Sequence, residues 1–249
     1  MAIYMGGEKY VPGMYVKQKP DAAEMSHRLI GKWDRERLEW KKEGAPKEMP
    51  ATICFARKIG VGALQIADIL GERIGYRVID REIMEYISNE AKLTQKTVAF
   101  FDERYPGRLN EFLSMAFGEK AFVKSDYAKQ LLSAVLSMAY LSPTIFVGRG
   151  AHLILPRERI LAVWFVASKS HRAKRLAAIL NVKEKEAESR LNQIDKEQQD
   201  FFNKVFGTMG TSPDEFDMVI NCDPIQKPEW AAEIVENAFK IKFGAELHS

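Results

Sequence analysis

The chain contains 249 residues, of which 46% are hydrophobic and 29% are charged, and this length allows one α/β domain with an insertion or an extension. Its 37 basic and 34 acidic residues leave a formal net charge of +3, which is too small a surplus to predict nucleic-acid binding. No apolar run approaches the roughly 20 residues that span a bilayer and the start of the sequence lacks the pattern of a signal peptide, so we expect a cytoplasmic protein that binds neither nucleic acid nor a membrane.

Residues 1–50 differ in composition from the rest and are expected to form an N-terminal extension with one helix. Residues 1–20 are rich in glycine, tyrosine and proline and show no period, so we expect them to be irregular. A charged helix is expected over residues 21–43, because glycine and prolines follow it. Its apolar residues do not form a single stripe, and two interpretations stay open. The helix docks on the rest of the chain, or it binds a protein partner, a second copy included.

Strands alternate with helices over residues 51–249, which predicts an α/β domain: a five-stranded parallel sheet covered by helices on both faces. The expected strands span residues 51–56, 76–79, 144–147, 160–167 and 217–222. The expected helices span residues 62–74, 82–141 with a break near Tyr105, 169–180, 183–202 and 228–243. In such folds ligands bind at the carboxyl ends of the strands, so the residues that follow each strand are the candidates for a site.

The first strand leads into a glycine-rich turn, in which Gly60 and Gly62 flank Val61 just before a helix. Backbone N–H groups in such a turn, together with the positive end of the helix dipole, suit a phosphate group. Arg57 and Lys58 lie earlier in the same turn and are candidates for positive charge. The alternative is a tight connection that binds nothing.

The full phosphate-loop motif, G-x-x-x-x-G-K-[ST], is absent from this turn. When Gly62 is placed at the second glycine, Ala63 occupies the lysine position and Leu64 the hydroxyl position. The turn therefore lacks the cation that contacts the outer phosphates and the hydroxyl that binds magnesium.

The next two strands end in arginines. Asp80 and Arg81 follow the second strand, and they predict either a phosphate contact through the forked guanidinium group or a surface ion pair that caps the following helix. The third strand ends in Gly148, Arg149 and Gly150. An arginine between two glycines has no neighbouring side chains to pack its stem, which favours phosphate binding.

Further cations lie on the two helices after the fourth strand. Arg172 and Arg175 stand near the start of the helix over residues 169–180, where positive charge opposes the helix dipole, so a nearby anion would explain them. The next helix carries Arg190 and Asp195. A solvated face of mixed charge is the alternative for both helices.

Four stretches match, in order and spacing, the cytidylate kinase-like family, a branch of the P-loop nucleoside monophosphate kinases. They are residues 57–62, 76–83, 146–152, and 183–188 with Asp195 and Lys196. The chain resembles this family from about Thr52 to Pro224, and the first 50 residues lie outside the resemblance.

The resemblance implies a helical insertion that binds the acceptor, over about residues 81–141, and a lid over about residues 171–206. It implies ATP as the donor, with magnesium if the protein is active. The donor phosphates would contact Arg57, Lys58, Gly60, Val61, Gly62 and Ala63, and the acceptor nucleotide would contact Asp80, Arg81, Gly148 and Arg149. The lid arginines would be Arg172, Arg175 and Arg190, and the catalytic residues Arg149, Arg172 and Asp195.

The lid departs from the family at Gln198, where relatives carry an arginine, so Asp195 is without its usual arginine partner. Two functions therefore stay open. One is a kinase that transfers the γ-phosphoryl group of ATP to a small nucleotide such as CMP. The other is a catalytically weak nucleotide-binding sensor that engages a partner through its N-terminal extension. Four cations distinguish the two functions: Arg57, Lys58, Arg149 and Arg172. Their convergence on one point would favour the kinase, and their dispersal would favour the sensor.

Overall fold

The computed structural model describes residues 3–5, 8–10, 21–43, 48–104, 126–207 and 211–244. The predicted break near Tyr105 lies outside these residues. Over the part of the chain that is described, no helix is both long and apolar enough to cross a membrane.

A five-stranded, all-parallel sheet forms the centre of the molecule, in the order β4-β5-β3-β6-β7. Its strands are β3 (Thr52–Arg57), β4 (Arg77–Asp80), β5 (Thr144–Val147), β6 (Ile160–Val166) and β7 (Met218–Asn221). The central strand β3 is buried along its whole length, as expected for a strand covered on both faces. The predicted sheet is confirmed.

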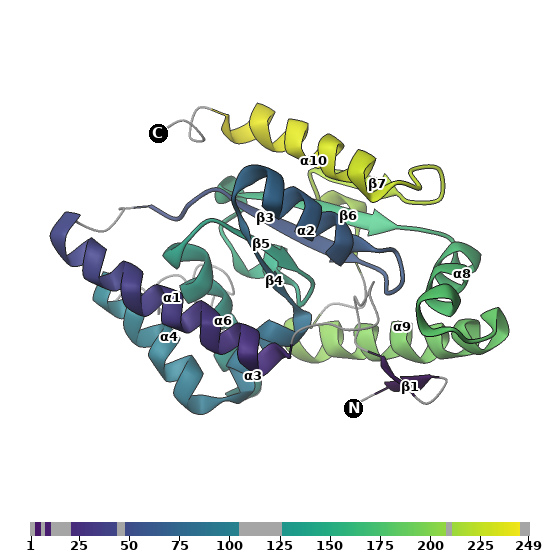
Figure 1. The fold of residues 1–249 in the computed structure, drawn as a ribbon, viewed down its shortest axis with the longest axis horizontal. Coiled ribbons are helices and arrows are strands. Elements are labelled where there is room, and N and C mark those ends of the chain that lie inside the picture. The colour runs from purple at the N-terminus through teal and green to yellow at the C-terminus, as the bar shows by residue number, and fades with distance from the viewer. Residues whose placement is uncertain are drawn as a thin grey trace.

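Helices cover the two faces of this sheet (Figure 1). Alternate residues of β3 point to opposite faces, so Ile53 and Phe55 pack with α2 (Ala63–Ile74) and α10 (Pro228–Phe243). Cys54 and Ala56 pack on the other side, in a core built largely by the helical insertion. That side carries α3 (Arg81–Asn89), α4 (Ala91–Arg104), α6 (Asp126–Leu141) and the short α7 (Ala151–Ile154).

Two further helices form a layer of their own beside the strand ends. They are α8 (Lys169–Leu180) and α9 (Glu184–Phe206), which share a small apolar core that includes Leu176 and Leu191. The α9 helix continues four residues beyond its predicted end at Phe202. Short 3₁₀ turns, η2 (Arg157–Arg159) and η3 (Pro213–Glu215), precede β6 and β7.

The N-terminal helix α1 (Ala22–Glu43) packs against α3, and its Ser26 and Ile30 are buried. Ile30 belongs to the core that α6 shares, so the helix docks on the rest of the chain. The interpretation of residues 1–20 as irregular is wrong in part, because β1 (Ile3–Met5) and β2 (Glu8–Tyr10) form an antiparallel pair.

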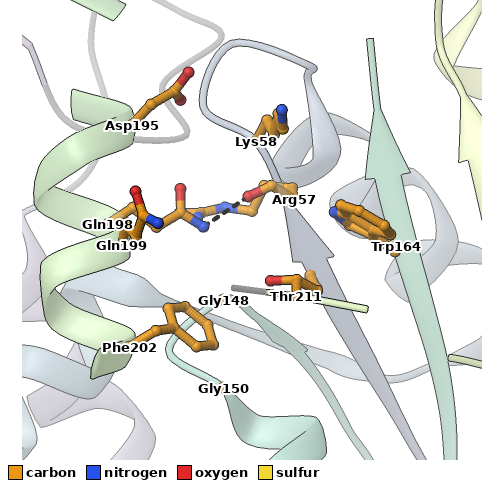
Figure 2. Close-up of a pocket in the computed structure, with 11 residues that line it drawn as sticks. Arg57, Lys58, Gly148, Gly150, Trp164, Asp195, Gln198, Gln199, Phe202 and Thr211 are labelled. Carbon is orange, nitrogen blue, oxygen red and sulfur yellow. Dashed lines mark hydrogen bonds between the residues drawn. The ribbon is translucent and has the colours of Figure 1, made fainter. Parts of the chain in front are cut away.

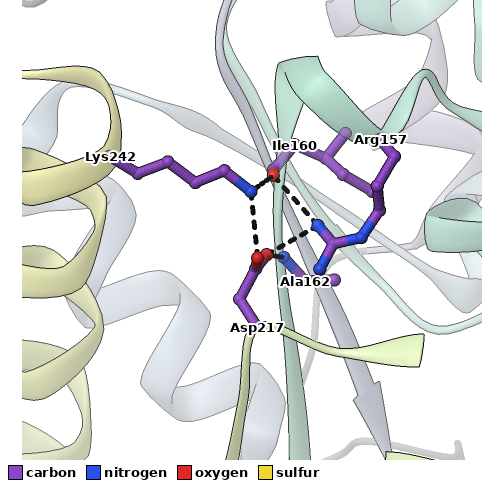
Figure 3. Close-up of polar contacts among 5 residues, drawn as sticks. All are labelled: Arg157, Ile160, Ala162, Asp217 and Lys242. Carbon is purple, nitrogen blue, oxygen red and sulfur yellow. Dashed lines mark hydrogen bonds and ion pairs between the residues drawn. The ribbon is translucent and has the colours of Figure 1, made fainter. Parts of the chain in front are cut away.

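One carboxylate, Asp217 directly before β7, joins the amino-terminal end of the sheet to helix α10 (Figure 3). Asp217 accepts hydrogen bonds from Arg157 (2.7 Å), from the Ala162 N–H (2.8 Å) and from Lys242 Nζ on α10 (3.0 Å). Lys242 also donates to the Ile160 carbonyl at 2.8 Å. Burial acts to raise the pKa of Asp217, but the hydrogen bonds from Arg157, Ala162 and Lys242 outweigh it and hold the pKa below its ordinary value.

We predict that Asp217→Asn lowers the free energy of unfolding at neutral pH by about 1–2 kcal/mol, the lower part of the range for charged hydrogen bonds because the carboxylate is partly exposed. The stabilisation by a carboxyl group with a lowered folded-state pKa is present above its unfolded pKa and is lost as the pH falls below about 4. Urea denaturation at pH 7 and at pH 3 should therefore show a difference between the two proteins that shrinks in acid. A constant difference would contradict the assignment, and Asp102→Asn on the exposed side of α4 is the control.

Candidate functional site

The glycine-rich turn connects β3 to α2. Gly60 and Gly62 have φ values of 91° and 89°, in the left-handed region that glycine adopts without a steric cost. Gly62 is the N-cap of α2 and offers no side-chain cap, so the first N–H groups of the helix have no intrahelical acceptor. These N–H groups and the helix dipole form a site suited to an anion.

The start of α8 packs directly on this turn. A Cβ atom at Gly60 would lie 3.1 Å from Cβ of Arg172, and one at Gly62 would lie 2.8 Å from Nε of Arg175. Arg175 also donates a hydrogen bond to Oε1 of Gln65 on α2, at 2.9 Å. The two cations predicted at the unfavourable end of α8 therefore lie against the glycine turn.

Arg172 links the turn to both lid helices. Its guanidinium group donates two hydrogen bonds of 2.8 Å to the carboxylate of Asp195 on α9, and one of 3.2 Å to the Ile59 carbonyl. The arginine partner that the sequence lacks at Gln198 is thus supplied from α8. Gln198 instead donates to the Arg57 carbonyl at 3.0 Å (Figure 2). The catalytic roles predicted for Arg172 and Asp195 stay predictions.

The segment after β5 has an unusual backbone. Gly148, Arg149 and Gly150 have φ values of 94°, 53° and 70°, so three consecutive residues lie in the left-handed region. For Arg149 this conformation is costly, and such strain concentrates at functional sites. The turn directs the Arg149 side chain to the Glu85 carboxylate on α3 and over the ring of Phe201 on α9, 3.9 Å from its centroid.

Three arginines come together here with little exposure. Arg57 and Arg149 are buried, and Arg81 is half-buried and contacts Glu85 at 3.1 Å. Burial, followed by the charges of Arg81 and Arg57, lowers the pKa of Arg149 to about 8. Among the described residues, the buried Nε of Arg149 has no hydrogen-bond partner. Glu85 favours the Arg149 cation, whereas burial and the two neighbouring arginines disfavour it, so a cluster with this charge and an unused donor is suited to a further anion.

Two cavities adjoin this cluster and share Arg57, Gln198 and Phe202 in their linings. The smaller, about 130 Å³, is lined by Arg57, Arg81, Arg149, Glu197, Gln198, Phe201 and Phe202. The larger, about 320 Å³, is lined by Ala56, Arg57, Lys58, Gly148, Gly150, Trp164, Asp195, Gln198, Gln199, Phe202 and Thr211 (Figure 2). Together they reach the size of a small-molecule site.

A third cavity of about 270 Å³ lies at the end of the glycine turn. Its lining combines cations of α8 with apolar groups from α2 and the chain after β7: Val61, Gly62, Ile66, His171, Lys174, Arg175, Cys222, Ile225, Gln226 and Pro228. The glycine turn therefore has one cavity at its start, beside Lys58, and another at its end, beside Arg175.

The remaining predicted site residues are either buried within the fold or exposed away from the cavities. Asp80 is buried and caps α3 by accepting a hydrogen bond from the Ile83 N–H at 3.0 Å, so the predicted capping is confirmed, although in the interior and not at the surface. Val61 and Ala63 are buried in the core under α2. Arg190 is exposed on α9 and lines none of the three cavities.

Sequence reasoning missed Glu85, although its position four residues after Arg81 on a helix is the spacing of an ion pair. Phe201 and Phe202, which no sequence motif singles out, also line the cavity beside Arg149. Three of the four cations whose convergence would favour a kinase border the two adjoining cavities: Arg57, Lys58 and Arg149. Arg172 reaches them through Asp195.

Comparison with known proteins found a match to one family model. The model of the cytidylate kinase-like family matches residues 52–224. A crystal structure of an uncharacterized protein from Eubacterium ventriosum is similar at a TM-score of 0.61 and 17% identity, covering 78% of this chain and 99% of that chain. At this identity the likeness concerns the fold alone. No curated protein gave a significant match.

Two kinases of small metabolites show weaker structural similarity. Shikimate kinase from Bacteroides thetaiotaomicron has a TM-score of 0.39 at 14% identity, covering 78% of this chain and 97% of that chain. A gluconokinase from Sinorhizobium meliloti has a TM-score of 0.42 at 14% identity, covering 82% of this chain and 99% of that chain.

We predict that Glu85→Gln strengthens the binding of phosphate-bearing ligands about 5–10-fold, because the neutral side chain no longer competes for Arg81 and Arg149. Calorimetric titration with inorganic phosphate and with CMP at low salt would measure this change. Glu82→Gln, which removes the same charge from the same helix, is the matched control. Weaker binding in Glu85→Gln would show that the carboxylate orders the arginines and does not compete with the ligand.

Proposed function

The chain belongs to the cytidylate kinase-like family, and we propose that it transfers the γ-phosphoryl group of ATP to a small nucleotide acceptor of the CMP type. One observation carries this proposal. The neighbouring strands β4, β5 and β3 each deliver an arginine at or just beyond the carboxyl end: Arg81, Arg149 and Arg57. The cavities beside these arginines also reach Lys58 at the start of the glycine turn, so the arginine cluster and the turn with its N–H groups are neighbours.

The donor would bind along the glycine turn. The N–H groups at the start of α2 would hold the triphosphate, with Lys58 at one end of the turn and Arg175 at the other. The cavity beside Arg175 has the apolar walls, Ile66 and Ile225, that a nucleoside base requires. Arg175 and Lys58 would then provide the positive charge that Ala63 cannot.

The acceptor phosphate would bind where Glu85 now contacts Arg81 and Arg149. An oxygen of this phosphate attacks the γ-phosphorus of ATP, the bond from the γ-phosphorus to the bridging oxygen breaks, and ADP leaves with the electron pair. A phosphate monoester is already largely deprotonated at pH 7, so this step requires no general base. Arg57 and Arg149 would neutralise the charge on the transferred group, and Phe201 and Phe202 would exclude water.

Magnesium has no built site among the described side chains. Leu64 is buried and offers no oxygen at the hydroxyl position, and the described residues contain no cluster of three or more His, Cys, Asp or Glu side chains able to hold a metal. Asp195 is engaged by Arg172. Magnesium would therefore enter only as the counter-ion of the ATP substrate.

We predict ATP-dependent phosphoryl transfer to a pyrimidine nucleoside monophosphate, and a loss of at least about 100-fold in turnover in Arg149→Ala, because one charged contact to the transferred group is removed. The assay would test a panel of nucleoside monophosphates with MgATP, alongside calorimetric binding of ATP and CMP. Arg28→Ala, which removes an exposed arginine of α1, is the control.

The outcomes separate the functions. Turnover that Arg149→Ala removes, with unfolding free energy unchanged, supports the kinase. Binding of ATP and CMP without turnover would replace the proposal with a nucleotide sensor, and absence of both would overturn it.

A further inference from the structure

The C-terminal helix α10 has two apolar faces. One packs on the sheet and on α2 through Ala231, Ala232, Val235, Phe239 and Phe243. The opposite face carries three large apolar side chains, Trp230, Ile234 and Ile241, which are 51%, 39% and 87% exposed. At 3.6 residues per turn these three lie in one line along the helix, with the exposed Asn237 between Ile234 and Ile241.

Single exposed apolar side chains are common, but a line of them on one helix face marks a contact surface. The helix lies on the outside of the molecule (Figure 1). It also lies beyond residues 52–224, the segment that matches the family model. The cavities of the candidate site do not include any residue of this stripe.

Charges beside the stripe indicate what covers it. Along one flank of α10 the order is Glu229, Glu233, Glu236 and then Lys240, so the first half of the flank is acidic and its last turn is basic. Two copies of this helix that pack antiparallel about a two-fold axis bring the same flank of each copy together in reverse order. Glu233 of one copy then lies near Lys240 of the other, and within its own copy Lys240 also pairs with Glu236 at 2.6 Å.

We propose that α10 binds α10 of a second copy of this chain, antiparallel, in a two-fold symmetric dimer. Trp230 of each copy packs against Ile241 of the other, and Ile234 and Asn237 lie at the two-fold axis. A single helix pair buries less than the ~1,200 Å² of a standard stable interface, so the dimer is expected to be weak, with a dissociation constant on the order of 10 μM.

Sedimentation velocity of the full-length protein from about 1 to 200 μM would test the proposal, and we expect a monomer–dimer transition within this range. Ile241→Lys should weaken the dimer at least tenfold without changing the unfolding free energy, because the side chain makes little contact within its own copy. Val219→Lys makes the same kind of change on exposed β7 and should leave the dimer intact. A protein that stays monomeric at every concentration, or an Ile241→Lys variant that dimerises like the wild type, would overturn the proposal.

Charge reversal tests the orientation. Glu233→Lys and Lys240→Glu should each weaken the dimer, and the two changes together should restore it, because the acidic and basic positions then exchange places in both copies. A double variant no stronger than the single variants would contradict an antiparallel pair.

Cross-linking gives a second measure of orientation. Asn237→Cys lies near the proposed two-fold axis, and a mild oxidant such as diamide should convert two such thiols into one disulfide between copies. Ile241→Cys should not cross-link, because in the antiparallel pair the two positions are roughly 16 Å apart along the helix axis, beyond disulfide reach. Native Cys54 and Cys222 are buried and should not interfere. Preferential cross-linking of Ile241→Cys would refute the antiparallel arrangement.

Discussion

The pairing of Arg172 with Asp195 is the contact on which the rest of the site depends. Burying a guanidinium group is costly unless it is paired, and here the carboxylate of α9 and the Ile59 carbonyl of the glycine turn accept hydrogen bonds from both terminal nitrogens of Arg172. The pair therefore fixes α9 relative to the turn. Because α9 carries Gln198, Phe201 and Phe202, the same contact determines the shape of both cavities beside the arginine cluster.

The arginine cluster persists despite two unfavourable energies, backbone strain and the burial of like charges. Arg149 lies in a left-handed conformation that costs on the order of 1 kcal/mol or more, and its charge is buried near two like charges. The surroundings hold it in place: a side chain at Gly150 would collide with the ring of Phe206, 2.5 Å from its Cβ position, so the lid helix closes directly over the turn. A fold that gains nothing from an anion here would be more stable with a smaller, neutral residue. Glu85 compensates part of this charge. Under the proposed function, the acceptor phosphate would have to displace this carboxylate.

Much of the fold was predictable because its signals are local. Buried parallel strands are short apolar runs, and the residues at their ends, such as Arg57 and Arg149, follow from the runs themselves. The contacts between elements were not predictable. The partner of Asp195 comes from α8, and its identity depends on how two helices pack, which neither helix reveals. The three-residue strands β1 and β2 are too short to show an alternating pattern. The second apolar face of α10 was present in the sequence, but a pattern cannot say which of two faces meets the core.

The central position of β3 has a consequence for synthesis of the protein. Ile53 pairs with Ile145 on one side and with Leu161 on the other, so both neighbours of this strand are translated long after it. While the ribosome makes the helical insertion, this apolar strand is exposed to solvent and has no neighbouring strand of the sheet to pair with. Long-range pairing of this kind slows folding and leaves an apolar strand open to aggregation until β5 and β6 have been translated.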